Sequence, residues 1–277
     1  MTVWFITGAS RGFGLEIARE ALSRGDSVVA TARDRQAVLD AIPGADDRLL
    51  AVALDVGNPA QITAAVDAAV ARFDHVDALV NNAGRGLVGS VEETSDAEIR
   101  AIFDVNVFGL LSVTRAVLPH MRARRSGLVV NLSSVGGFVA WPGWGVYAAT
   151  KFAVEAVSEA MTHELAPLGI RSVAIEPGPF RTNFLDGSSL AFTGHVIEDY
   201  ASTSGAARTW ATDFNYGQQG DPVKAAKIIV DLADREELPE RIQLGANAFD
   251  DVAAKVARTA RDQETWRSVS LSADFDD

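Results

Sequence analysis

The sequence predicts an α/β fold, with a single doubly wound parallel sheet of about seven strands and helices on both of its faces. Short apolar runs alternate with amphipathic helical segments along most of the chain. Strands that are apolar almost throughout are typical of parallel sheets, because helices cover both faces. A hydrophobic content of 48% supplies a large core. Because no linker, repeat or low-complexity block interrupts the pattern, we expect one domain over residues 1–277.

The alternation gives each element an expected position. Asp221 and Pro222 are typical of a helix start, with Asp as the N-cap and Pro in the first turn. The long helical stretch 96–124 contains Pro119, where we expect a break. Residues 183–220 lack clear periodicity and form the one candidate insertion. The predicted strands are 3–6, 27–31, 49–54, 78–80, 128–132, 172–175 and 241–244, and the other predicted helices are 13–24, 62–73, 147–165 and 246–266.

Composition excludes several classes of partner and site. The formal charge of −12 argues against nucleic acid or an anionic membrane as a partner. Without cysteine, disulfides and thiolate metal sites are excluded. No run approaches the ~18 apolar residues of a membrane span, and no signal peptide is evident, so we expect a cytoplasmic protein. We expect no metal site, because the four histidines lack ligand spacing: His75, His120, His163 and His195.

A glycine-rich turn lies between the first strand and the first helix. Gly8, Gly12 and Gly14 let the backbone turn tightly and approach a pyrophosphate. The helix N-terminus that follows offers free N–H groups and a partial positive charge. A plain strand–helix turn is the alternative interpretation.

Tyr147 and Lys151 are four residues apart on a predicted helix, thirteen residues after Ser134. Positions i and i+4 share one helix face, so a phenol and an ammonium can act on one small volume. A free tyrosine has a pKa of about 10, and a nearby cation lowers it. The pair alone is common by chance. Downstream of the glycine turn, it indicates a nucleotide-dependent redox enzyme with tyrosine as acid and base.

The order and spacing of these motifs resemble the classical short-chain dehydrogenase/reductase family over roughly residues 2–245. The motifs are the glycine turn, Asn81-Asn82-Ala83-Gly84, Asn106, Ser134, Tyr147, Lys151 and Pro177-Gly178. The resemblance implies a Rossmann-like fold and four catalytic residues. Tyr147 would exchange a proton with the substrate oxygen. Ser134, chosen over Ser133 by its spacing, would orient the carbonyl. Lys151 would bind the nicotinamide ribose, and Asn106 would hold a water in a proton relay.

The resemblance also implies NADP(H) as the cofactor. NAD-preferring relatives place an acid at the end of the second strand, where this chain has Ala32. Arg11 and Arg33 can instead grip a 2′-phosphate, although both fit solvated surface charges as well. Asp55 matches an adenine contact or caps its loop, and Thr182 would face the carboxamide. The further cofactor contacts expected are Ser10, Phe13, Val56, Asn82, Ala83, Gly84, Pro177 and Gly178.

Aromatic residues indicate the substrate. Trp141 and Trp144 lie between Ser134 and Tyr147, and Phe184 opens the insertion 183–220. Because ligand pockets are mostly apolar, we expect an apolar or aromatic ketone or aldehyde, with a secondary alcohol in the reverse direction. We expect the insertion to act as a substrate lid, although it also fits a segment that packs on its own side chains.

The chain continues past the last strand as a helical extension over 246–277, where many relatives end in a segment that packs a tetramer. This puts a tetramer in doubt and leaves a homodimer or monomer open. Two other functions stay open on the same scaffold: a non-catalytic NADP(H) sensor and another chemistry such as epimerisation or dehydration. The presence of all four catalytic residues favours an enzyme over a sensor, and the short substrate region and single-domain length argue against sugar-nucleotide chemistry, so a carbonyl reductase is the leading hypothesis.

Overall fold

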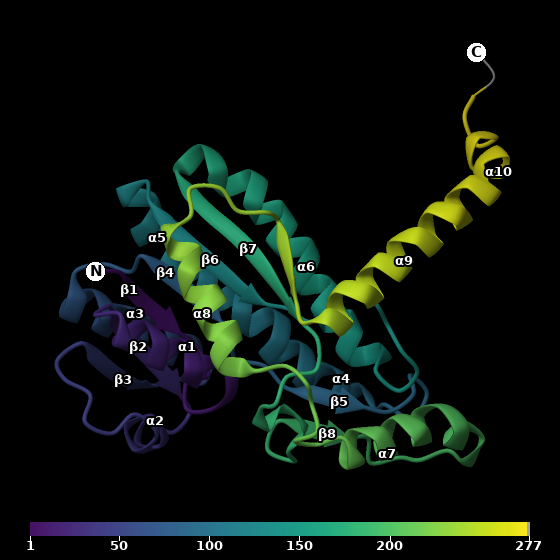
Figure 1. Ribbon diagram of the computed structural model, residues 1–277, viewed down its shortest axis with the longest axis horizontal. Coiled ribbons are helices and arrows are strands. Elements are labelled where there is room, and N and C mark those ends of the chain that lie inside the picture. Colours follow the sequence, from purple (N-terminus) through teal and green to yellow (C-terminus); the bar gives the residue numbers. More distant parts are fainter. Residues whose placement is uncertain (276–277) are drawn as a thin grey trace.

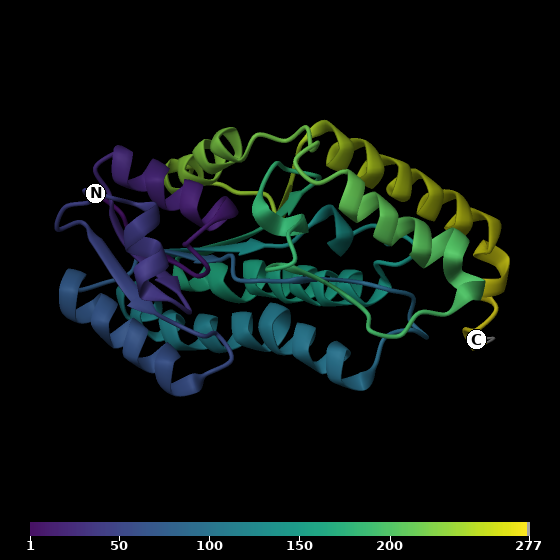
Figure 2. The same ribbon diagram turned by 90° about the horizontal axis from the view of Figure 1, so that it is seen from below.

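The computed structural model of the protein describes residues 1–275 and has a parallel sheet between two layers of helices (Figures 1 and 2). All seven predicted strands are confirmed, and all of them pair in parallel. Their order across the sheet is β3 (Leu49–Ala53), β2 (Ser27–Ala32), β1 (Val3–Ile6), β4 (Ala78–Asn81), β6 (Gly127–Leu132), β7 (Ile170–Pro177) and β9 (Arg241–Leu244).

Successive strand residues enter two separate cores, as the period of two along a strand requires. Trp4 and Ile6 pack with α1 (Gly12–Ser23), α2 (Arg35–Ala41) and α8 (Pro222–Asp231) on one face. On the other face, Phe5 packs with α3 (Pro59–Phe73), α5 (Leu110–Arg124) and α6 (Gly145–Leu165). The strand order reverses between β1 and β4, and at such a switch point the loops after the strands open a crevice.

The stretch Asp96–Arg124 breaks in a different place from the one expected. It comprises α4 (Asp96–Phe103), a π-helical turn (Asp104–Gly109) and α5, which continues through Pro119. Pro119 is exposed, so water can satisfy the carbonyl that its ring leaves free. By length and composition alone this stretch is long and apolar enough to cross a membrane, although no such run was expected from the sequence. In the fold, Val113, Val117 and Met121 are buried in the core.

The insertion 183–220 is more ordered than its sequence suggests. Its strand β8 (Leu190–Phe192) pairs in parallel with β5 (Gly86–Val88), and helix α7 (Ala206–Asp213) follows. Neither short strand was predicted, and α2 was also missed. Beyond β9, α9 (Ala246–Thr265) projects from the body and leads into α10 (Arg267–Leu271) (Figure 1). The remaining short turns are 3-10 helices at Val135–Gly137, Ala166–Leu168, Asn183–Leu185, Glu198–Tyr200 and Leu232–Asp234, and a π-helix at Ala201–Gly205.

Candidate active site

The glycine turn is packed so tightly that side chains are excluded at two of its positions. Gly8 has φ of +67°, and a β-carbon there would lie 3.1 Å from Ala83 Cα. A β-carbon on Gly14 would lie 2.5 Å from Gly8 O. Asn82 donates its amide hydrogens to Thr7 O (2.8 Å) and Gly8 O (3.0 Å), so this predicted cofactor residue fastens the turn to β4.

Helix α1 starts directly at this turn and has no side-chain cap among the described residues. The N–H groups of its first turn are therefore available to an anion, and the helix dipole favours one there. The absent side chains leave room for the backbone to contact a pyrophosphate. These features fit a dinucleotide cofactor.

A cavity of about 500 Å³ extends from the glycine turn past the ends of β2 and β3. Ala32 and Arg33 line it, as does Asp55, whose carboxylate also accepts a hydrogen bond from Gly57 N at 2.9 Å. Asp55 therefore caps its loop whether or not it also contacts an adenine. The other predicted cofactor residues that line this cavity are Gly8, Ser10, Arg11, Gly12, Phe13, Val56, Asn82, Ala83, Gly84 and Thr182.

A second cavity, of about 680 Å³, adjoins the first and shares Phe13, Gly84 and Thr182 with it. Three predicted catalytic residues line this second cavity: Ser134, Tyr147 and Lys151. So do the predicted substrate residues Trp141, Trp144 and Phe184, and the predicted cofactor residues Pro177 and Gly178. Of the predicted site residues, Gly14 and Asn106 line neither cavity and support those that do.

Tyr147 and Lys151 are both buried, and burial favours the neutral form of each. Burial raises the pKa of Tyr147 to about 12, and the Ser134 hydroxyl opposes this rise. Burial likewise lowers the pKa of Lys151 to about 8, against the charge of Glu155. Lys151 Nζ donates to Leu132 O at 2.7 Å, which fixes the side chain between α6 and the end of β6. Tyr147 is therefore protonated near neutrality and ready to donate a proton.

Asn106 lies in the π-helical turn between α4 and α5, a local irregularity that is frequent at functional sites. Its Nδ2 donates to Arg85 O (2.9 Å) and Thr150 Oγ1 (3.0 Å), and its Oδ1 accepts from Arg85 N (2.9 Å). Thr150 in turn donates to Tyr147 O at 2.7 Å. Asn106 thus ties the loop after β4 to the helix that carries Tyr147 and Lys151.

Aromatic rings surround the Tyr147 side chain. The rings of Trp144 and Phe184 each lie 5.7 Å from the Tyr147 ring, and Trp210 of α7 lies 6.2 Å from Trp144. Of the lid's large apolar residues, Phe184, Leu185 and Trp210 line the second cavity. The polar residues Gln218, Asn247 and Asp251 also line the second cavity. They were not predicted as site residues, because no local sequence motif marks them.

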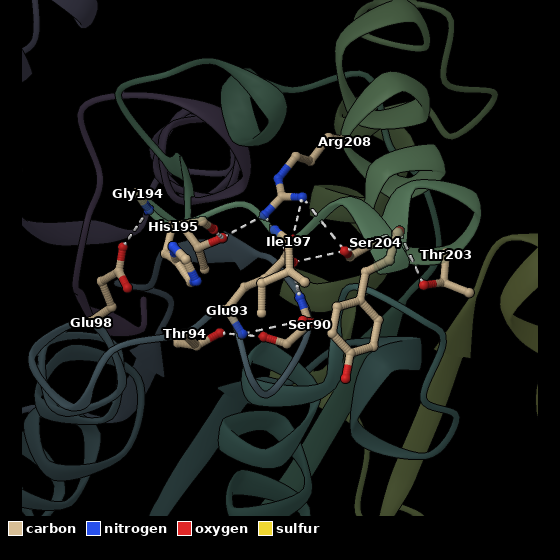
Figure 3. Close-up of polar contacts among 12 residues, drawn as sticks. Ser90, Glu93, Thr94, Glu98, Gly194, His195, Ile197, Thr203, Ser204 and Arg208 are labelled. Atoms are coloured by element: carbon tan, nitrogen blue, oxygen red, sulfur yellow. Dashed lines mark hydrogen bonds and ion pairs between the residues drawn. The ribbon is translucent and has the colours of Figure 1, made fainter.

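An ion pair between Glu93 and Arg208 fastens the insertion 183–220, here called the lid, to the segment before α4 (Figure 3). The Glu93 carboxylate, just before α4, accepts hydrogen bonds from Arg208 of α7 at 3.0 and 3.2 Å. It also accepts from Ser204 Oγ (2.7 Å) and Ile197 N (3.0 Å). Burial alone would raise the pKa of Glu93, but the bonds from Arg208 and the backbone hold it well below its usual range. The lid is therefore fastened by a fully ionised pair.

Comparisons with known proteins agree with this geometry. A family model described as short chain dehydrogenase matches residues 2–190. The oxidoreductase BOA17 of Botryotinia fuckeliana is 34% identical over 98% of both chains. The crystal structure of a short-chain dehydrogenase from Streptomyces avermitilis has a TM-score of 0.92 at 40% identity, covering 99% of this chain and 100% of that one.

More distant solved structures of the same fold contain a nicotinamide nucleotide. A short chain dehydrogenase/reductase from Burkholderia phymatum is in complex with NAD, with a TM-score of 0.78 at 26% identity over 97% of this chain and 95% of that one. A serine dehydrogenase is complexed with NADP⁺, also at 26% identity, with a TM-score of 0.75 over 88% and 94% of the two chains. These structural neighbours bind either nucleotide, so similarity alone does not select one.

Proposed function

The chain belongs to the short-chain dehydrogenase family, and we propose that it is an NADP(H)-dependent reductase of apolar ketones or aldehydes that oxidises secondary alcohols in reverse. The observation that carries this proposal is the position of Tyr147. Its side chain lines the aromatic cavity beside Lys151, where that cavity adjoins the one at the glycine turn. A bound nicotinamide would supply or accept the hydride.

The residues of the second cavity have separate roles in this reaction. Ser134 Oγ orients the carbonyl oxygen by a hydrogen bond. Tyr147 donates its proton to that oxygen during reduction and removes the alcohol proton during oxidation. The Lys151 ammonium favours the phenolate that this transfer leaves behind. Asn106 and Thr150 hold α6 in place while the proton moves.

Preference for NADP(H) is supported by the charges at the end of β2. Arg33 is exposed beside the first cavity and makes no side-chain hydrogen bond or ion pair within residues 1–275. Ala32 supplies no carboxylate for a ribose, and Asp34 accepts the capping bond of α2 from Gln36 N. Arg11 bonds Ser188 of the lid in this structure, at 2.7 Å. Arg33 is therefore the cation most available to a 2′-phosphate.

Exchanging these charges tests the cofactor assignment. The double variant Ala32→Asp with Arg33→Ala adds an acceptor for ribose hydroxyls and removes the phosphate partner. We expect the ratio of kcat/KM for NADPH over NADH to fall by about tenfold or more, since charge-assisted hydrogen bonds contribute about 1.5–3 kcal/mol each. An unchanged ratio would show that the 2′-phosphate is bound elsewhere.

The aromatic cavity supports an apolar substrate of some bulk. Trp144, Phe184 and Trp210 offer three ring surfaces, and about 680 Å³ is within the range of sites for drug-sized ligands. The proposed activity is tested by following NADPH and NADH oxidation against a panel of ketones and aldehydes of increasing size. We expect turnover with NADPH that improves with aromatic or branched substituents. Turnover confined to small polar carbonyls would contradict the substrate assignment.

A further inference from the structure

Two buried glutamates lie behind Lys151, and the proposed mechanism gives neither a role. Glu155 is one helical turn after Lys151 on α6, so the two share a helix face. Glu176 is on the neighbouring strand β7. Only 5% of Glu155 and none of Glu176 is exposed. Carboxyl groups buried to this degree require partners, because an isolated buried charge is costly.

As two carboxylates, the pair has too few hydrogen-bond donors for its four oxygens, because only Glu176 Oε2 accepts a hydrogen bond within residues 1–275, from Gln243. Both oxygens of Glu155 and Oε1 of Glu176 have no hydrogen-bond partner within residues 1–275. Ionised carboxylates only accept hydrogen bonds, whereas a protonated one also donates. Burial raises the pKa of Glu155 to about 7. The Ser133 hydroxyl and Arg241 oppose this rise, and the neighbouring Glu176 adds to it. A single proton between them supplies the missing donor and removes one of two like charges.

The cationic surroundings are too few to neutralise two charges. From β9, Arg241 Nε lies 3.9 Å from Glu155 Oε2, but this guanidinium also contacts Glu159 and lies 3.8 Å from Glu240. Gln243 of β9 donates to Glu176 Oε2 and carries no charge.

On the side toward the end of β6, Ser133 packs close to Glu155. A β-carbon on Gly137 would lie 2.5 Å from Ser133 Oγ and 2.9 Å from Glu155 Cγ. Lys151 is therefore the cation on α6 that balances the pair, and Arg241 is shared among three carboxylates.

We propose that Glu155 and Glu176 hold one proton between them, and that the remaining negative charge keeps Lys151 in its ammonium form beside Tyr147. The inference rests on the proposed tyrosine mechanism for its consequence but not for its measurement. Glu155 is a positioning residue, since it acts on Tyr147 through Lys151. Without its charge, burial alone would drive the lysine toward the neutral amine, and the phenolate would lose its stabilising neighbour.

The ionisation of Lys151 can be followed directly, because the chain has only four lysines: Lys151, Lys224, Lys227 and Lys255. With ¹³C-labelled lysine, the Cε signals of the full-length protein are titrated by NMR. We expect Glu155→Gln to lower the pKa of Lys151 by about one unit. Glu176→Gln leaves the charge on Glu155 and should shift the pKa of Lys151 much less. Glu159→Gln is the matched control, since it alters an exposed glutamate on the same helix that also contacts Arg241.

An unshifted Lys151 titration in folded Glu155→Gln protein overturns the proposal. Wild-type protein gives a second test that needs no variant. Its Lys151 signal should show an additional step near neutral pH, as the pair loses its shared proton, and absence of that step would also count against the pair.

A kinetic measurement then links the pair to catalysis. In Glu155→Gln, the acidic limb of the pH profile for alcohol oxidation should move about one unit toward alkaline pH, while Glu159→Gln leaves it in place. A merely structural role would lower the whole profile without moving its limb. If Tyr147→Phe retained activity, the tyrosine mechanism would fail, yet the lysine titration would still decide the state of the carboxyl pair.

Discussion

Two buried glutamates of this protein have opposite surroundings, and the difference separates a structural carboxylate from one available for function. Glu93 is ionised and surrounded by donors from Arg208, Ser204 and the backbone. Glu155 faces another carboxyl group and lacks hydrogen-bond partners within residues 1–275. The first carboxylate fastens the lid to the body. The second lies behind Lys151 with its pKa raised to about 7, where a change in protonation alters the charge beside the catalytic residues.

Of the substitutions that separate the two glutamates, we expect the largest loss of stability from removing Arg208, the cation that pairs with Glu93. Arg208→Met leaves Glu93 buried without its countercharge. Breaking a buried pair in this way costs about 3–5 kcal/mol, so we expect a loss of about 4 kcal/mol in the free energy of unfolding in urea. Arg115→Met is the matched control, because Arg115 is exposed on α5 and, within residues 1–275, its side chain makes a single hydrogen bond, to Ser112 at 3.4 Å. Equal losses in the two variants would mean that the lid pair contributes nothing specific.

The pH dependence of stability tests the other glutamate. Folding raises the pKa of Glu155 from 4.5 to about 7, so the folded state binds this proton more tightly. The stability that the folded state gains from binding this proton is fully present below about pH 4.5 and is lost as the pH rises through about 7. From pH 5 to pH 8 we expect the difference in unfolding free energy between wild type and Glu155→Gln to decrease by at most about 3 kcal/mol. A difference that is constant or grows with pH would contradict a raised pKa.

The same substitution at both sites sharpens the comparison further. Glu93→Gln removes a carboxylate that accepts five hydrogen bonds. We expect the free energy of unfolding to fall by about 2 kcal/mol, the usual contribution of hydrogen bonds to a charged group. At pH 8, Glu155→Gln removes one of two like charges and supplies an amide donor, so its stability should equal or exceed that of wild type. Urea unfolding at a single pH measures both variants. A larger loss at Glu155 than at Glu93 would reverse the interpretation.

Local patterns predicted most of the fold and the candidate site residues. The short apolar runs that alternate with helical segments, together with the glycine turn, identified the sheet, because these patterns depend on residues that are close in the sequence. The helix break was wrongly placed at Pro119, which is exposed and lies inside the continuous helix α5. The break lies instead at the π-helical turn around Asn106, which leaves no mark in the sequence. The lid's strand β8 was missed because three residues acquire their structure by pairing with β5.

The carboxyl pair was missed for a related reason. In the sequence, Glu155 has the pattern of an ordinary solvent-exposed helix glutamate. Glu176 is the last residue of an apolar strand segment before Pro177-Gly178. Only the packing of α6 on β7 brings them together, and within residues 1–275 three of their four buried oxygens have no hydrogen-bond partner. Likewise, Gln218 and the first turn of α9 reach the second cavity through tertiary packing. Long-range contacts of this kind leave no periodic signal.

The most direct test of the proposed mechanism is the Tyr147→Phe variant. Tyr147 should be dispensable for binding the nucleotide, so NADPH affinity, followed by nicotinamide fluorescence, is expected to stay within about threefold of wild type. With the best carbonyl substrate from the panel, turnover should fall by about a thousandfold, which is within the range that a positioned acid contributes. Turnover within about tenfold of wild type, with NADPH still bound, would contradict Tyr147 as the proton donor and the proposed mechanism with it.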